Sequence, residues 1–420
     1  MNQSQKKLEE AIADIEQIRR RGRSHEQAAD LGIALNNLAN RYAESGRLLD
    51  AINALREAVA IAREATEAGG SGPPNVELAT SLNNLAVTLW EVGRIKDASE
   101  TYREAIDMRR RLAESDPSYS VDLALALSNY SIVLLDMGQL DEADRVAREA
   151  LRLATSALGA THPQVASTLT NLGNVSSAHY AATGDLADLD ESIALYRRGL
   201  TILTGVYGPE HSQVASTMSN LGNVLSARYA ATGDLADLEQ VTDLYRRALA
   251  ILTRVYGREH PQVANTSANL GNALSSRYAA AGDLADRNEA IDLYRQALDT
   301  QIWVYGPEHP QVARTMSNLA NLLSTRNAAS SEPRDLEQAI DLYRRALAIL
   351  TAAYGPEHLQ VVSTSANLAN ALSAHYASTS EVADRDEAIG LYRRALNGLP
   401  RDDPSRDTIN KGLNELLRAR

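Results

Sequence analysis

The chain has 420 residues, 44% of them hydrophobic, with no Cys or Phe and a formal net charge of −12. This acidic balance argues against a general role in binding nucleic acid or acidic membranes, and the lack of Cys excludes disulfides and thiolate metal sites. No apolar leader follows Met1, and no stretch is expected to reach the length of a membrane span, so a soluble, cytoplasmic protein is expected.

Residues 1–22 carry apolar side chains at helical spacing, which predicts one amphipathic helix that caps the N-terminal end. Residues 23–161 then form three units. Each unit has an asparagine in its expected first helix, a glycine nine residues later that is expected to end that helix, and an alanine-rich second helix. The asparagines that mark these units and the next are 47, 45 and 42 residues apart: Asn37, Asn84, Asn129 and Asn171.

Residues 162–400 form five units with a fixed period of 49 residues, and each begins at a histidine: His162, His211, His260, His309 and His358. Two neighbouring copies match at roughly 30 of their 49 positions, which is the signature of a solenoid. The asparagine-to-tyrosine distance is seven residues longer here than in the second unit (25 against 18). Because seven residues are close to two helical turns, we expect each helix of a hairpin to gain about one turn. Residues 401–420 predict a C-terminal capping helix.

Three motifs carry a family resemblance: Asn-Leu-Gly-Asn at 220–223, a glycine turn at Gly233, and Tyr-x-x-Ala-Leu at 245–249. They resemble the tetratricopeptide repeat, and the long period with the linker Tyr-Gly-Pro-Glu-His-Pro at 305–310 resembles its kinesin light chain type. The resemblance implies an all-α, right-handed α-solenoid of about eight helix-turn-helix repeats with terminal capping helices. In such a solenoid the first helices line a concave groove.

The function that this resemblance implies is a non-enzymatic scaffold for protein–protein interaction, which binds a peptide or a partner segment in the groove. Similar repeats also occur beside nucleotide-binding domains, so a regulatory or sensor module of a larger signalling assembly is the alternative. Near-identical repeats also make a homo-oligomer possible. No cofactor is expected, and residues copied five times are poor candidates for one catalytic centre.

An uncharged row of asparagines recurs on the first helices of the 49-residue units, at positions that share one helix face. Carboxamides both donate and accept hydrogen bonds, so such a row suits the main chain of an extended peptide. The structural alternative, for the first and for the second asparagine of each unit, is that they bridge adjacent first helices and hold the pitch of the superhelix. The candidate binding residues in this row are Asn171, Asn174, Asn220, Asn223, Asn269, Asn272, Asn318, Asn321, Asn367 and Asn370.

The matching positions of the earlier units are more apolar and acidic. Trp90 is one of two tryptophans, and a tryptophan in a groove is a typical anchor for a partner, although it could also fill the hairpin core. If this end is a groove, its preferred ligand presents an apolar side chain and a basic residue. The candidate binding residues here are Val87, Trp90, Glu91, Ile132 and Leu135.

Two other patterns are expected to have structural roles. The five histidines are one repeat apart, too far to share a metal ion, and are expected to be turn residues at helix starts. Three arginines, at positions 228, 277 and 326, are expected to pair with Asp234, Asp283 or Asp335 near the hairpin turns. Capture of an acidic or phosphorylated segment is the alternative for this row.

Overall fold

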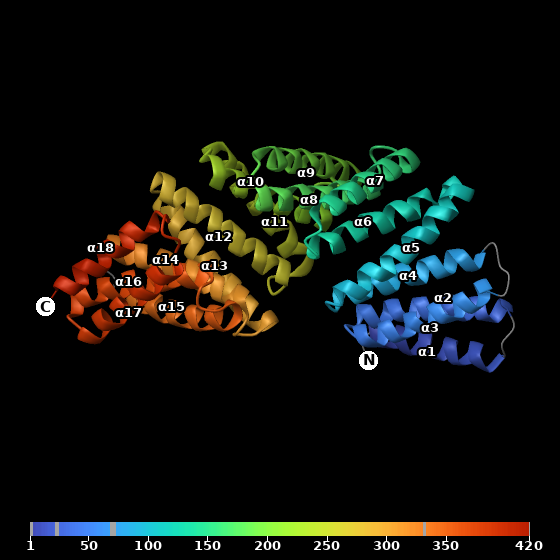
Figure 1. Ribbon diagram of the computed structural model, residues 1–420, viewed down its shortest axis with the longest axis horizontal. Coiled ribbons are helices and arrows are strands. Elements are labelled where there is room, and N and C mark those ends of the chain that lie inside the picture. The colour runs from blue at the N-terminus through green and yellow to red at the C-terminus, as the bar shows by residue number, and fades with distance from the viewer. Residues whose placement is uncertain (1–2, 22–24, 68–72, 331–332, 420) are drawn as a thin grey trace. The chain divides into compact units, whose positions relative to one another are not determined.

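The computed structural model describes residues 3–21, 25–67, 73–330 and 333–419. All regular elements in these residues are helices, which confirms the expected fold class (Figure 1). Contacts within the chain divide it into two compact units, unit 1 (Met1–Pro209) and unit 2 (Glu210–Arg420).

In unit 1, consecutive helices pack as hairpins, α2 on α3, α4 on α5, α6 on α7 and α8 on α9, while α1 packs on α2. The elements are α1 (Gln3–Arg21), α2 (His25–Glu44), α3 (Leu48–Glu67), α4 (Pro73–Glu91), α5 (Ile95–Ser115), the 3-10 helix η1 (Pro117–Tyr119), α6 (Ser120–Asp136), α7 (Leu140–Leu158), α8 (Pro163–Thr183) and α9 (Leu186–Tyr207).

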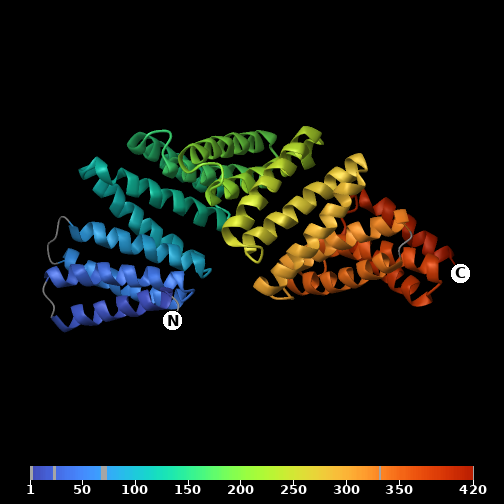
Figure 2. The same cartoon turned by 180° about the vertical axis from the view of Figure 1, so that it is seen from behind.

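Unit 2 has the same construction, with α10 on α11, α12 on α13, α14 on α15 and α16 on α17, and α18 packs against α17 (Figure 2). Its helices are α10 (Ser212–Thr232), α11 (Leu235–Tyr256), α12 (Pro261–Ala281), α13 (Leu284–Tyr305), α14 (Pro310–Ser330), α15 (Pro333–Tyr354), α16 (Leu359–Thr379), α17 (Val382–Gly398) and α18 (Ser405–Arg418). The described part of the chain therefore holds eight hairpins in an α-solenoid arrangement, with one further helix at each end.

In the turn inside the long hairpins, a glycine ends the first helix and an aspartate begins the second. Gly233 ends α10 in the left-handed conformation (φ 73°), which a β-carbon disfavours. Asp234 then begins α11 as its N-cap, where the side chain accepts a hydrogen bond of 3.0 Å from the backbone N–H of Ala236. The same pair recurs at Gly184-Asp185 and Gly282-Asp283.

The linkers between the long hairpins use each repeated histidine as the N-cap of a first helix. In His260, for example, Nδ1 accepts a hydrogen bond of 3.2 Å from the backbone N–H of Gln262. Its ring also stacks on Tyr256, the last residue of α11, at 4.3 Å between centroids. The histidines are therefore helix-start residues, as the sequence predicted.

The longer hairpins gain their extra residues on both sides of the turn. From Asn220 to Gly233 there are thirteen residues, against nine in the shorter hairpins, so the first helix is about one turn longer between its asparagine and the turn. From Gly233 to Tyr245 there are twelve residues, against nine in the second hairpin, which adds nearly a turn between the turn and the tyrosine and keeps Tyr245 in the core, 2% exposed. The extra residues thus lie on both sides of the turn as expected, but the expected gain of one turn per whole helix was too large, because the long hairpins have helices of 21 and 22 residues, such as α10 and α11, against 19 and 21 in α4 and α5.

One segment among the described residues, Pro117–Asp136, is long and apolar enough to cross a membrane by length and composition alone. The expectation that no segment reaches this length was therefore wrong for the segment formed by η1 and α6. Half of the apolar window is buried inside the structure. The burial arises because α6 packs against α5, α7 and α8, so that several sides of this helix face other helices.

Candidate partner-binding face of the first helices

The asparagines of unit 2 form a repeated arrangement that we call the amide clasp. In each clasp, one asparagine Oδ1 accepts two hydrogen bonds, one from a tyrosine hydroxyl in its own hairpin and one from the asparagine Nδ2 of the next first helix. Asn223 Oδ1 accepts from Tyr245 Oη at 2.6 Å and from Asn269 Nδ2 at 3.0 Å. The other two clasps are Asn272 with Tyr294 (2.6 Å) and Asn318 (2.8 Å), and Asn321 with Tyr343 (2.5 Å) and Asn367 (3.0 Å).

In each clasp, a buried tyrosine holds the asparagine in place through its hydroxyl group. Tyr245, Tyr294 and Tyr343 are each 2% exposed, and burial raises the pKa of their hydroxyl groups. A buried hydroxyl needs a hydrogen-bond acceptor, and the asparagine supplies it. At the two outer positions of the row the same contact occurs without a second donor among the described contacts, in Tyr196 to Asn174 and Tyr392 to Asn370.

The clasps support the structural alternative for both asparagines of a unit. The first asparagines Asn269, Asn318 and Asn367 each donate to the second asparagine of the preceding first helix. The clasps nevertheless leave the row of asparagines accessible to solvent. Among the ten candidate asparagines none is buried, and Asn223, Asn272 and Asn370 are exposed.

A hollow lies beside the third clasp. The pocket, of about 450 Å³, lies between α12 and α14. Its lining combines hydrogen-bonding groups with small apolar ones, from Ser275, Tyr278, Ala279, Gly282, Asn321, Leu322 and Thr325. Because Asn321 Oδ1 already accepts two hydrogen bonds, the group that it can offer to a guest there is Nδ2, a donor.

Unit 1 bridges its first helices differently. Ile132 stands where a clasp would need an asparagine, so Asn171 instead donates to Ser128, to the backbone oxygen at 3.2 Å and to Oγ at 3.0 Å. Near the N-terminal end, Asn84 donates to Asn36 Oδ1 at 3.1 Å, and Asn36 donates to Ser81 Oγ at 2.7 Å. Bridging is thus common to both units, while the clasp occurs in unit 2.

The apolar candidate residues of unit 1 are accessible but partly engaged. Trp90 on α4 is half-buried, and its indole Nε1 donates to Asp136 Oδ2 on α6 at 2.6 Å. Val87 is also half-buried and packs against the core, whereas Glu91 is exposed. Ile132 and Leu135 on α6 are half-buried. The carboxylate of Asp136 therefore already accepts one hydrogen bond, from Trp90.

The row of arginines near the hairpin turns makes ion pairs, but two of the expected partners were wrong. Arg228 pairs with Asp237 (2.6 and 2.8 Å) and Arg277 with Asp286, one turn beyond Asp234 and Asp283. The physical reason is that Asp234 and Asp283 are N-caps, which turns their carboxylates toward the backbone. The expected pair of Arg326 and Asp335 is present, at 2.5 and 2.6 Å. In the last hairpin the pair is His375 and Asp384, at 2.5 Å.

The tyrosines were not predicted to be part of this face. Their signal was available, because each clasp tyrosine follows its asparagine by 22 residues, as in Asn223 and Tyr245. No group of three His, Asp or Glu side chains that could hold a metal ion occurs in the residues that the structure describes.

The fold and this face define a helical repeat protein of the kind that presents an extended surface to partners. Family models for the tetratricopeptide repeat match residues 122–180, residues 33–68, 78–118, 165–212, 214–249 and 312–360, and residues 366–407. These matches span more than half of the chain, so it belongs to the tetratricopeptide repeat family. Membership of this family indicates a protein-interaction module, and its fold generally serves as a non-enzymatic scaffold.

Among curated proteins, none matches this sequence. Solved structures that are similar include BtubC (BKLC) from P. vanneervenii, with 22% identity, a TM-score of 0.48, and 62% of this chain and 92% of that chain covered. A putative kinesin light chain with nearly identical TPR-like repeats from Podosopora anserina has 21% identity, a TM-score of 0.41, and 56% and 96% covered. A signal transduction ATPase with numerous domains (STAND) with a tetratricopeptide repeat sensor, from Pyrococcus horikoshii, has 10% identity and a TM-score of 0.59. That alignment covers 99% of this chain and 55% of the other.

Proposed function

We propose that the first-helix face of unit 2 binds an extended peptide segment of a partner protein through the main chain of that segment. The amide clasp carries this proposal. Because Asn223, Asn272 and Asn321 each direct Oδ1 inward to two donors, each amide is held in one orientation and can offer Nδ2 to a carbonyl of the guest. A row of fixed donors needs no side-chain rearrangement on binding, which lowers the entropic cost.

The proposal extends to unit 1 as a site for side chains. Trp90, with Val87, Ile132 and Leu135 nearby on α4 and α6, gives an apolar surface next to the carboxylates of Glu91 and Asp136. A partner residue that combines an apolar stem with a positive charge fits this surface. The remaining candidate asparagines of unit 2, in α10 and α16, belong to the same proposed face, and Asn171 and Asn174 of α8 are proposed to bind a partner segment within unit 1.

The test is a substitution that keeps the clasp but removes the donor. In Asn223→Asp/Asn272→Asp/Asn321→Asp, one carboxylate oxygen still accepts from the tyrosine and the next asparagine, whereas the outward group becomes an acceptor. We expect peptides selected from a display library on the full chain to bind this variant at least tenfold more weakly by fluorescence anisotropy, because each donor to the guest main chain is lost.

Two controls separate main-chain recognition from added charge. Asn288→Asp/Gln296→Glu adds negative charge on α13 and should leave the affinity unchanged. Conversely, N-methylation of alternate backbone nitrogens in the peptide blocks the recognition of an extended main chain and should weaken binding to the wild type. Equal affinities for the wild type and the clasp variant, with the helical content unchanged, would refute the proposal.

A second candidate function is a sensor module of a larger signalling assembly. The observation that favours it is the likeness to the STAND protein with a tetratricopeptide repeat sensor, which extends over 99% of this chain. A sensor should change its superhelix when ligand binds, whereas an adaptor should not. Small-angle scattering with and without a selected peptide distinguishes the two, and an unchanged radius of gyration excludes the sensor.

A further inference from the structure

The second helices of the hairpins are joined by a series of ion pairs. In each, an arginine of one second helix contacts a glutamate of the next, as Arg246 of α11 contacts Glu289 of α13 at 2.6 Å. We call each such pair a rung. The other rungs are Arg63 with Glu104, Arg110 with Glu149, Arg148 with Glu191, and Arg344 with Glu387.

One rung of unit 2 is interrupted. Arg295 of α13 has the same place in its repeat as Arg246 and Arg344, but the residue 43 positions further on, where the others have a glutamate, is Gln338. The ion-pair partner of Arg295 among the described residues is Asp292, on its own helix and 4.0 Å away. Its charge also lowers the pKa of Asp335, although the hydrogen bond from Arg326 contributes more to that shift. Arg295 therefore lacks the close carboxylate that its counterparts have.

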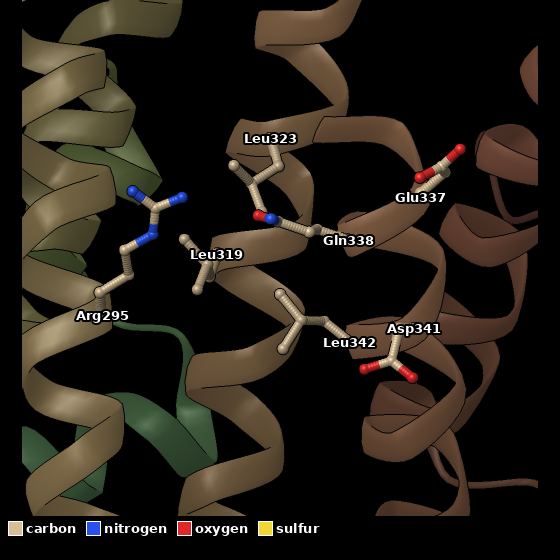
Figure 3. A pocket seen from close by; sticks show the side chains of 7 residues that line it. All are labelled: Arg295, Leu319, Leu323, Glu337, Gln338, Asp341 and Leu342. Atoms are coloured by element: carbon tan, nitrogen blue, oxygen red, sulfur yellow. The ribbon is translucent and has the colours of Figure 1, made fainter. Parts of the chain in front are cut away.

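A pocket of about 490 Å³ opens at this interruption, between α13 and α15 and above α14. Its floor is formed by Leu319 and Leu323 of α14, with Leu342 beside them. In Figure 3 the guanidinium of Arg295 and the amide of Gln338 extend toward the leucines from opposite sides. The carboxylates of Glu337 and Asp341, which also line the pocket, are turned away from the leucines (Figure 3).

Unit 1 has a pocket beside the rung of Arg110, which follows its repeat tyrosine by eight residues, whereas Arg295 follows its own by one. There the pocket across α5, α6 and α7 is about 230 Å³, roughly half as large. Arg110, which lines it, is paired with Glu149, and Arg103 donates to Tyr130 Oη at 2.9 Å. The cations that line this pocket are therefore already engaged, whereas Arg295 has no close carboxylate across its groove among the described residues.

We propose that this pocket is a second docking site, for a partner helix that carries a glutamate one turn away from a leucine. The glutamate replaces the missing carboxylate of the rung and meets Arg295 and Gln338, while the leucine packs on the half-buried Leu342, over the buried floor of Leu319 and Leu323. Charge complementarity selects the acidic residue, and we place the leucine one turn away from it because Leu319 and Leu323 lie in the floor of the groove, between Arg295 and Gln338. The site lies on the second helices, so it is independent of the amide clasps.

The test compares the wild type with Gln338→Glu, in which a carboxylate replaces the amide and the size of the side chain is unchanged. A display library of 12-residue peptides is selected on the full chain and counter-selected on Gln338→Glu, in which the rung with Arg295 is completed. Enriched peptides should carry an acidic residue three or four positions from a leucine. Measured singly by fluorescence anisotropy, such a peptide should bind Gln338→Glu and Arg295→Gln at least tenfold more weakly than the wild type, because each change removes the cation available to the guest.

Two matched variants locate the effect. Gln338→Ala opens the pocket without completing the rung, so binding should stay within about threefold of the wild type. Glu289→Gln interrupts the rung to Arg246, above Leu270 and Leu274 at the equivalent positions, and should add a second site, so that the stoichiometry rises from one to two. Peptides that bind the wild type and Gln338→Glu equally, a library with no acidic enrichment, or a stoichiometry of one in Glu289→Gln would each overturn the proposal.

Discussion

The two units hold neighbouring first helices together in different ways. In unit 2, three successive clasps join Asn223, Asn272 and Asn321 to a buried tyrosine and to the next repeat. In unit 1, Val87 and Ile132 occupy the clasp position of the second and third hairpins, and Asn171 bonds to Ser128 instead. A regular polar bridge thus gives way to apolar contacts with individual hydrogen bonds.

This difference determines which side chains of each unit can be replaced without loss of a hydrogen bond. A clasp ties three side chains to one oxygen atom, so a change at any one of them leaves a buried or half-buried polar group without its partner. When an apolar contact such as that of Val87 is changed, no polar group loses a hydrogen-bond partner. Under the proposed function, the regular clasps of unit 2 serve uniform recognition along its length, whereas in unit 1 an individual residue such as Trp90 serves the recognition of one side chain.

The largest effect is expected from the ion pair near the turn. Asp286 is 3% exposed and pairs with Arg277, whose side chain is 28% exposed. Asp286→Ala leaves a partly buried arginine without its partner and should lower the local stability of the α12–α13 hairpin by about 3 kcal/mol. Hydrogen exchange of that hairpin measures the loss, because repeat arrays open locally.

The matched change in unit 1 is Asp188→Ala. Asp188 is half-buried and receives a hydrogen bond of 3.4 Å from Thr183, and the position of the arginine is taken by His179. Its loss should cost about 0.5 kcal/mol, within the range of surface substitutions. Equal losses for the two variants would show that burial of the pair does not distinguish the units.

The next largest effect is expected from the clasp itself. Asn272→Ala removes the acceptor of both Tyr294 and Asn318, and should destabilise α12 and α14 by about 2 kcal/mol in hydrogen exchange. Val87→Ala, at the same repeat position in unit 1, loses two methyl groups from a half-buried site and should cost about 1 kcal/mol. A smaller effect for Asn272→Ala than for Val87→Ala would contradict the structural role assigned to the clasp.

A smaller effect is expected at Trp90. Trp90→Phe keeps most of the ring but removes the hydrogen bond of 2.6 Å to Asp136, which should cost about 1 kcal/mol in the stability of α4 and α6. Trp303, 76% exposed, serves as the control, since Trp303→Phe should change stability by less than about 0.5 kcal/mol. Both are measured by urea unfolding. If the two substitutions have the same effect, the bond from Trp90 to Asp136 contributes nothing.

Much of the fold was predictable because it depends on spacing. The distances between asparagine, glycine and tyrosine determine helix lengths, and the glycine-aspartate pair determines the turn, so the hairpins followed from the sequence. The hydrogen-bond partners between repeats could not be predicted in this way. Asn269 reaches Asn223 across 46 residues, and a sequence does not show which amide atom faces which neighbour. Arg228 had two nearby aspartates, and only the N-cap geometry of Asp234 decides between them.

The smallest effect is expected from mild acid, and it concerns an ion pair of unit 2. The hydrogen bond from Arg326 holds the pKa of Asp335 below its usual value near 3.8. A depressed folded-state pKa means that the stabilisation is complete above the unfolded value and declines as the pH falls below it toward the folded value. Between pH 7 and pH 5 the wild type and Arg326→Gln should therefore keep a constant difference in the stability of α14 and α15. That difference should shrink below about pH 4, because protonation of Asp335 removes in the wild type the interaction that the variant already lacks. Hydrogen exchange at matched intrinsic rates measures it, and a difference that grows in acid would reverse the assigned sign.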